Sequence, residues 1–92
     1  MEYYILLEPK AIIEIREAFD WYEDQKDGLG YELLAEFEEC YKLLIKNPER
    51  FSYIDSLYRR IKTNRFPYIL VYEIDGDTIS INSVRHTRQK PL

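Results

Sequence analysis

A group of basic side chains that could contact an anionic partner follows residue 58, together with the only histidine of the chain. The cations considered as contact residues are Arg59, Arg60, Lys62, Arg65, Arg85 and Arg88. Arginine suits a phosphate or carboxylate partner because its guanidinium is always charged and binds two oxygens at once. Histidine is the side-chain type best suited to move a proton near neutral pH, and His86 is the only one in the chain. With His86 moving a proton and Tyr68 or Tyr72 stacking on a base, such a set could cleave RNA through a 2′-hydroxyl.

Each of these residues also has a structural interpretation. In an ideal strand Arg59 shares a face with Leu57 and Ile61, which favours a buried or partner-bound structural arginine. Arg60 and Lys62 lie together on the opposite face, which favours a shared contact with a polyanion or a protein. Tyr68 and Tyr72 alternate with apolar residues, so core packing is expected for at least one of them. His86 lies near the predicted end of a strand, where capping an edge competes with catalysis.

Several other chemistries lack a signal in the sequence. There is no metal-ligand spacing, no phosphate-binding glycine loop and no nucleophile motif, so we expect no metal and no cofactor. The single cysteine, Cys40, cannot form an internal disulfide and lies in a helical pattern, so we expect a packed thiol in a reduced, cytoplasmic setting. No stretch approaches the roughly 18 uninterrupted apolar residues of a membrane span, and the N-terminus lacks a signal-peptide layout.

Charge is divided unevenly along the chain, whose formal net charge is −4. Residues 1–58 hold 14 acidic and 6 basic side chains, a net charge of −8. Residues 59–92 hold 3 acidic and 7 basic side chains, a net charge of +4. The basic part indicates a surface for a polyanion or an acidic partner, and the alternative is a solvated helix pair beside an ordinary sheet. The acidic side chains of the first part are expected to form a solvated helix surface.

The elements that must position these residues are two helices followed by strands. Residues 3–7 predict a strand, and Pro9 suits a first helical turn. Apolar stripes predict one helix up to residues 27–28, where Asp27-Gly28 should end it, and a second over residues 30–46, ended by Asn47-Pro48. Two striped helices joined by a few residues form an antiparallel hairpin, here over residues 9–47.

The remainder of the chain predicts three strands. They are residues 57–62, residues 66–74 as a covered central strand, and residues 78–84, with Asp75-Gly76 as a two-residue turn between the last two. The order β-α-α-β-β-β indicates an α+β fold, in which the N-terminal strand and the helical hairpin pack on a mostly antiparallel sheet. We expect one domain over residues 1–92.

Short segments of the chain match, in order, those of a known toxin family. They are residues 18–23 (AFDWYE), 28–30 (GLG), 45–48 (IKNP), 59–60 (RR), 66–68 (FPY) and 84–88 (VRHTR), together with Tyr72. Across nearly its whole length the chain resembles the RelE/ParE superfamily of type II toxin–antitoxin toxins, the plasmid stabilisation proteins. The WYE, GLG and FPY segments look closer to ParE-like members. The ending His86-Thr87-Arg88-Gln89 differs from the longer His-Gly-Arg-Arg tail of many members.

This resemblance implies a growth-inhibiting toxin that a cognate antitoxin neutralises by direct binding. ParE-like members inhibit DNA gyrase by binding it, whereas RelE-like members are endoribonucleases that cut messenger RNA on the ribosome. The ParE-like interpretation is preferred, the RelE-like one is the alternative with His86 as the catalytic candidate, and an inactive remnant serving as a binding module is a third. Whether the chain is an enzyme depends on that choice. A homodimer and a toxin–antitoxin hetero-oligomer are both compatible with the sequence.

Overall fold

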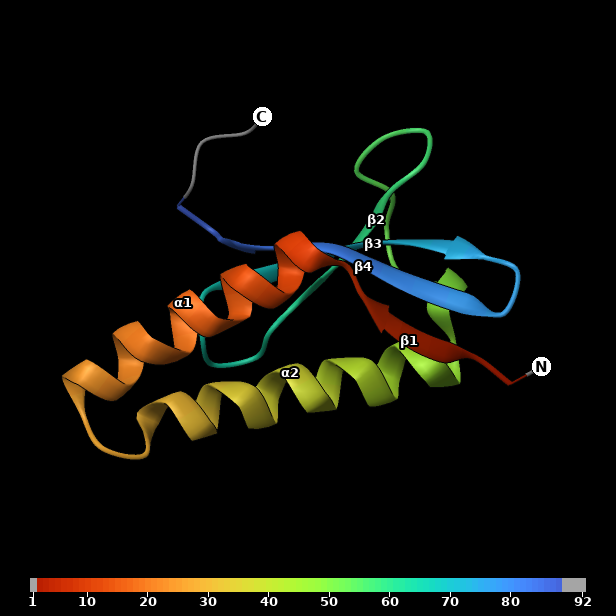
Figure 1. The fold of residues 1–92 in the computed structure, drawn as a ribbon. Helices are drawn as coiled ribbons and strands as arrows, with labels where there is room; N and C mark the ends of the chain where they lie inside the picture. The colour runs from red at the N-terminus through yellow and green to blue at the C-terminus, as the bar shows by residue number, and fades with distance from the viewer. Residues whose placement is uncertain (1, 89–92) are drawn as a thin grey trace.

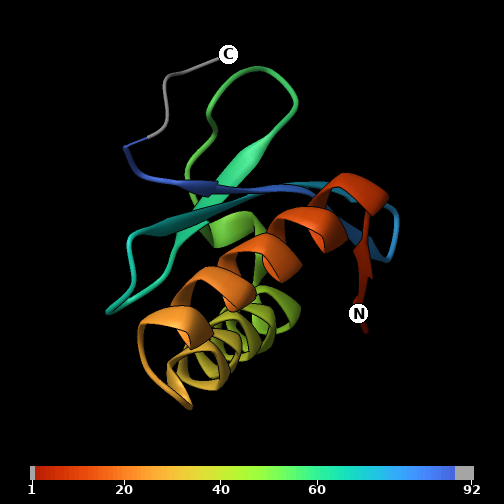
Figure 2. The same cartoon turned by 60° about the vertical axis from the view of Figure 1, so that its left-hand side comes forward.

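The computed structural model describes residues 2–88, which form a two-layer arrangement of a helical hairpin and a sheet (Figure 1). The elements in chain order are β1 (Tyr4–Leu7), α1 (Pro9–Gln25), α2 (Leu29–Lys46), the short 3-10 helix η1 (Pro48–Arg50), β2 (Arg59–Lys62), β3 (Tyr68–Asp75) and β4 (Thr78–His86). Both helices lie on the same side of the sheet, as the turned view in Figure 2 shows. The predicted order and the α+β class are confirmed. No helix within residues 2–88 is long and apolar enough to cross a bilayer.

The four strands are ordered β1-β4-β3-β2, so the two long strands β3 and β4 are central. β3 pairs antiparallel with both β2 and β4, whereas β1 pairs parallel with β4. The mostly antiparallel sheet is therefore confirmed. The turn between β3 and β4 lies at Gly76-Asp77, one residue later than predicted, and Gly76 adopts a φ of 62° that glycine accepts without strain.

A β-bulge in β4 changes which side chains face the helices. Tyr72 lies opposite Ile81 and Val71 lies opposite Ser83, so Asn82 is left without a partner on β3. One extra residue reverses the alternation beyond it. As a result Ile81 and Val84 both lie on the helix-covered face of the sheet.

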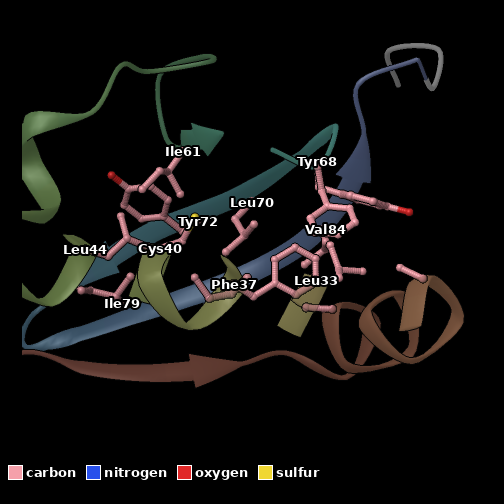
Figure 3. Packing of buried hydrophobic residues seen from close by; sticks show 14 residues of the cluster. Leu33, Phe37, Cys40, Leu44, Ile61, Tyr68, Leu70, Tyr72, Ile79 and Val84 are labelled. Carbon is pink, nitrogen blue, oxygen red and sulfur yellow. The ribbon is translucent and has the colours of Figure 1, made fainter. Parts of the chain in front are cut away.

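The core lies between α2 and this covered face. Figure 3 shows side chains of α2, among them Leu33 and Phe37, on the side of Leu70 and Val84 of the sheet. All four are buried, and the side chain of Tyr72 is fully buried beside them. The Tyr72 hydroxyl donates a hydrogen bond of 2.6 Å to the carbonyl of Pro48, which ties η1 to the centre of the sheet.

The helical hairpin turns through a close contact that requires glycine. A Cβ on Gly30 would lie 2.7 Å from the Phe19 ring and 2.8 Å from the Phe19 carbonyl. The Glu23 carboxylate accepts hydrogen bonds from the N–H groups of Gly28 (3.2 Å) and Gly30 (2.8 Å), which begin α2. Gly28 has a φ of 88°, but it opens α2, while α1 already ends at Gln25. The prediction that Asp27-Gly28 closes the first helix placed that end about two residues late.

The bounds of β2 and β3 differ from prediction because side chains bind the backbone before each strand. Asp55 accepts hydrogen bonds of 2.8 Å from the N–H groups of both Leu57 and Tyr58, so β2 starts two residues later than predicted. These bonds lower the pKa of the Asp55 carboxyl below its usual value. The Glu36 carboxylate likewise accepts from the N–H groups ahead of β3, including that of Phe66 at 3.1 Å, so β3 starts at Tyr68. β4 continues two residues beyond the predicted end, to His86.

Candidate functional site

The sheet face opposite the helices combines an apolar centre with cations on both sides. Lys62, Ile69 and Arg85 lie side by side across β2, β3 and β4 in one row. Arg60, Val71 and Ser83 form the neighbouring row. Directly paired residues of adjacent strands point to the same face of a sheet. The predicted shared face of Arg60 and Lys62 is therefore confirmed, and Arg85 joins them on it. We call this surface, with Ile54 above it, the basic face.

A hollow of about 320 Å³ lies on the basic face. Its lining consists of Ile54, Arg60, Ile69, Val71, Arg85, His86 and Thr87. Ile54 belongs to the loop before β2 and is half exposed, while Val71 at the base of the hollow is buried. Apolar side chains at the base with cations at the sides suit an amphipathic, acidic segment.

A second hollow, of about 410 Å³, continues along the outer edge of β2. It is bounded by Leu43 at the end of α2, by Arg50 and Phe51 after η1, and by Arg60 and Lys62 of β2. Arg60 lines both hollows, so the cationic surface extends around the edge of the sheet. The N–H of Arg60 points to this edge and donates to the carbonyl of Ser52 at 3.1 Å.

Arg59 binds the protein's own backbone and a neighbouring tyrosine. Its guanidinium donates hydrogen bonds to the carbonyls of Glu49 (2.9 Å) and Phe51 (2.8 Å), and to the Tyr53 hydroxyl (2.8 Å). It also lies 3.9 Å from the centroid of the Tyr53 ring. Arg59 is half-buried, and these contacts hold the segment after η1 against β2, which favours the structural interpretation of this side chain.

Arg65 lies apart from the basic face, in the turn before β3. Its guanidinium forms an ion pair of 2.8 Å with Glu32 of α2 and lies over the Phe66 ring at 4.5 Å. Its charge is therefore already balanced by the helical hairpin. Arg88 follows β4 in an exposed turn, where its backbone N–H donates to Nδ1 of His86 at 3.1 Å.

Tyr68 and His86 are paired residues of β3 and β4 on the helix-covered face. Their rings meet edge to face at 5.4 Å, and Tyr68 also contacts the ring of Phe37 at 5.9 Å. Tyr68 is buried, and burial raises the pKa of its phenol to about 12. Core packing, predicted for at least one of Tyr68 and Tyr72, holds for both. The His86 ring therefore lies at a strand end that borders both faces, against Tyr68 on the helix side.

The Cys40 thiol is buried in the core, as predicted. Burial, with the charges of Glu36 and Glu39, raises its pKa to about 11, so it is protonated and unreactive near neutral pH. Within residues 2–88 no group of three or more His, Cys, Asp or Glu side chains could hold a metal ion.

Comparisons with known proteins agree with this geometry. The family model described as "ParE toxin of type II toxin-antitoxin system, parDE" matches residues 5–91. The chain belongs to the ParE toxin family. A solved structure titled "Chromosomal ParDE TA system from P. aeruginosa" superimposes with a TM-score of 0.82 at 14% identity, covering 95% of this chain and 98% of that one. A search of curated protein sequences found no match. The chain is thus a toxin component of a type II system with the ParE fold.

Two of the segments on which the resemblance rests have a structural role. Glu23 of the WYE segment and the two glycines of GLG form the turn of the helical hairpin.

Some acidic side chains that were expected on a solvated surface are bound by the protein itself. Glu14 is half-buried and accepts a hydrogen bond of 2.9 Å from the N–H of Val84. Glu8 accepts one of 2.6 Å from the Ser80 hydroxyl. The expectation that the acidic helix surface is simply solvated was therefore wrong at Glu14 and Glu23, while Glu8 precedes the helix. No local pattern in the sequence marks the contacts of Glu8 and Glu14, because their donors lie 72 and 70 residues away along the chain.

Proposed function

We propose that the basic face of this ParE-family toxin is the surface that its cognate antitoxin covers. The observation that carries the proposal is the arrangement of Arg60, Lys62 and Arg85 around Ile69 and Val71. An antitoxin segment with apolar residues flanked by aspartate or glutamate would bury the apolar centre and pair with the cations. Burial supplies affinity, while the charges steer the encounter and fix the register. The buried, protonated Cys40 suits a reducing cytoplasm.

We further propose that the toxin inhibits its target by binding it, as ParE-like inhibition of DNA gyrase requires, rather than by cleaving RNA. Cleavage needs a proton-transfer group and cations around one phosphate. The His86 ring contacts Tyr68 on the helix side, and the three cations of the basic face lie on the other side of the sheet. The packing of the His86 ring against the buried Tyr68 supports a binding mechanism.

One observation favours the RelE-like alternative. His86 also borders the 320 Å³ hollow that Arg60 and Arg85 line. A phosphate bound in that hollow would be close to the end of β4. A ribonuclease site, if present, would therefore lie in this hollow, and both mechanisms can be compared in one strain.

The antitoxin proposal is tested by charge reversal on the basic face. The double variant Arg60→Glu, Arg85→Glu should weaken binding to the antitoxin encoded beside the toxin by about a hundredfold, because two attractive contacts become repulsive. Arg16→Glu, at an exposed position of α1, is the matched control and should bind normally. Circular dichroism checks that both variants fold. Unchanged affinity in the folded double variant would place the antitoxin elsewhere.

The target is tested by inducing the toxin with and without the neighbouring antitoxin gene. Plasmid supercoiling and messenger RNA cleavage are scored in the same cells. The binding mechanism predicts that the toxin reduces plasmid supercoiling. The His86→Gln variant should inhibit supercoiling within about twofold of the unmodified toxin, because a binding surface loses little affinity when one group is removed. Site-specific messenger cleavage that ends in a 2′,3′-cyclic phosphate and disappears in His86→Gln would replace this mechanism with the ribonuclease.

A further inference from the structure

A second concave site lies on the helix side of the sheet, where α1 meets the end of β4. Two adjoining hollows, of about 320 and 230 Å³, share Trp21, Tyr68 and His86 in their lining. Glu14, Glu17 and Ala18 bound the larger hollow, and Tyr22 bounds the smaller. We call this site the seam cleft. It lies on the opposite side of the sheet from the basic face and takes no part in the proposed antitoxin contact.

The helical repeat of α1 creates the cleft. Glu14, Ala18 and Trp21 are spaced by four and three residues, so their side chains lie on one face of the helix. Ala18, between the two larger residues, is buried and carries only a methyl group. The small side chain leaves the hollow open between Trp21 and Glu14.

Aromatic rings form one wall of the seam cleft. Trp21 meets Tyr22 edge to face at 4.9 Å, and Tyr22 contacts Tyr68 at 6.2 Å. Trp21 is nevertheless 58% exposed, unusually open for a large aromatic side chain. The face of an aromatic ring is negative, so exposed rings in a concave site attract cations.

The charges of the seam cleft have the sign opposite to that of the basic face. Glu14 and Glu17 are its acidic members, and neither takes part in the two ion pairs found within residues 2–88, which join Lys42 to Glu39 and Arg65 to Glu32. The hydrogen bond from the Val84 N–H holds the Glu14 carboxylate in place before any ligand arrives. Two carboxylates beside aromatic faces attract a cation and repel a phosphate.

We infer that the seam cleft binds an arginine side chain presented by a partner protein. The planar guanidinium stacks on Trp21 and donates to the carboxylate of Glu17, with its stem over Ala18. Arginine suits this site better than lysine because its planar, weakly hydrated cation stacks on rings and binds carboxylates through two bonds. The two hollows lie at and just below the lower end of the range of small-ligand pocket volumes, which suits one side chain.

The experiment uses the only tryptophan of the chain as its reporter. The indole N–H resonance of Trp21 is followed by NMR in the full-length toxin during titration with N-acetyl-arginine amide at constant ionic strength. N-acetyl-citrulline amide, which has the same shape without the charge, is the matched probe. We expect a saturable shift with a millimolar dissociation constant for arginine, and binding at least about fivefold weaker for citrulline.

Substitutions in the toxin complete the test. Glu17→Gln should weaken arginine binding about threefold to fivefold, because the amide keeps one acceptor oxygen but loses the charge and the second acceptor of this exposed carboxylate. Glu38→Gln, at an exposed position of α2 outside the cleft, should leave it unchanged. Equal binding of the two probes, no saturable shift, or equal weakening by both substitutions would overturn the inference. A saturable shift with uridine 3′-monophosphate but not with arginine would also overturn it. Neither substitution lies on the basic face, so the outcome of this test does not depend on whether the antitoxin binds there.

Discussion

At the scale of single residues, some side chains that the sequence offered as contact residues instead bind other parts of the protein. Tyr72 is the clearest case, since its ring is fully buried and its hydroxyl binds the Pro48 carbonyl. Arg59 is a second, with three hydrogen bonds to the segment between Glu49 and Tyr53. A donor that is already paired within the protein contributes to stability and is not available to a ligand.

Replacing Tyr72 by phenylalanine tests this assignment. The variant should lose about 1 to 2 kcal/mol of unfolding free energy, because the buried Pro48 carbonyl loses its partner while the ring still fills its place. Urea denaturation measures the change, and Tyr31→Phe, at an exposed ring, is the control. A variant with normal stability but impaired antitoxin or target binding would show that the hydroxyl serves recognition instead.

Ionisation of the buried phenols and thiol predicts a loss of stability at high pH. Burial raises the pKa of Cys40 to about 11 and the pKa values of Tyr41, Tyr68 and Tyr72 to about 12. A raised pKa in the folded state means that the neutral form is favoured there. The contribution is therefore complete below the unfolded values, near pH 9 for cysteine and pH 10 for tyrosine, and is lost as pH rises toward 12.

The unfolding free energy should thus be nearly constant from about pH 7 to pH 9 and fall by about 2 kcal/mol or more by pH 11 to 12. Denaturation curves at several pH values measure this free energy, and the ultraviolet absorbance of tyrosinate reports the ionisation of the phenols over the same pH range. Cys40→Ala should move the start of the decline to higher pH, because the first group to ionise is gone. Free ionisation of all tyrosines near pH 10 without loss of structure would contradict the prediction.

At the scale of elements, the hairpin turn fixes how α1 and α2 meet. Alanine normally stabilises a helix relative to glycine by about 1 kcal/mol. At Gly30 the added Cβ would collide with the side chain and the carbonyl of Phe19, so the sign reverses. We expect Gly30→Ala to lower the unfolding free energy by about 2 kcal/mol.

Gly28→Ala is the comparison for that prediction. Nothing lies within 4 Å of a Cβ at Gly28, so only the cost of its φ of 88° applies, about 1 kcal/mol. Thermal denaturation of the two variants gives the order of the effects. An increase in stability for Gly30→Ala would mean that the helices do not approach each other as closely as described.

At the scale of the whole molecule, the sheet separates two surfaces of opposite charge. The basic face carries Arg60, Lys62 and Arg85, and the seam cleft carries Glu14 and Glu17. A toxin with a net charge of −4 can therefore still attract an acidic partner, provided that the partner approaches the basic face.

Salt should consequently slow antitoxin association more than it speeds dissociation. Raising NaCl from about 50 mM to about 500 mM should lower the association rate constant by about tenfold, because screening removes long-range steering. The dissociation rate should change much less, since apolar contacts around Ile69 and Val71 are not screened. Stopped-flow or surface-binding kinetics separates the two constants. An association rate that is independent of salt would show that the basic face does not guide the encounter.

Local pattern in the sequence was sufficient to predict the elements and their order. The apolar stripes over α1 and α2, and the alternation in β3 and β4, depend on near neighbours that repeat at 3.6 or 2 residues. The same alternation predicted correctly that Arg60 and Lys62 share a face. Element ends were less accurate, because they depend on distant side chains: Glu36, on α2, binds the backbone just before β3.

Only the tertiary structure decided which face the last residues of β4 occupy and what the acidic side chains do. Strict alternation from Ile79 and Ile81 would have placed Arg85 on their covered face and His86 on the other. The unpaired Asn82 reverses this, so Arg85 joins the basic face and His86 turns toward Tyr68. A bulge arises from the pairing of two strands, and the hydrogen bond from the Val84 N–H to the Glu14 carboxylate joins residues 70 positions apart. Neither has a short-range periodicity, so the chain must fold before either is determined.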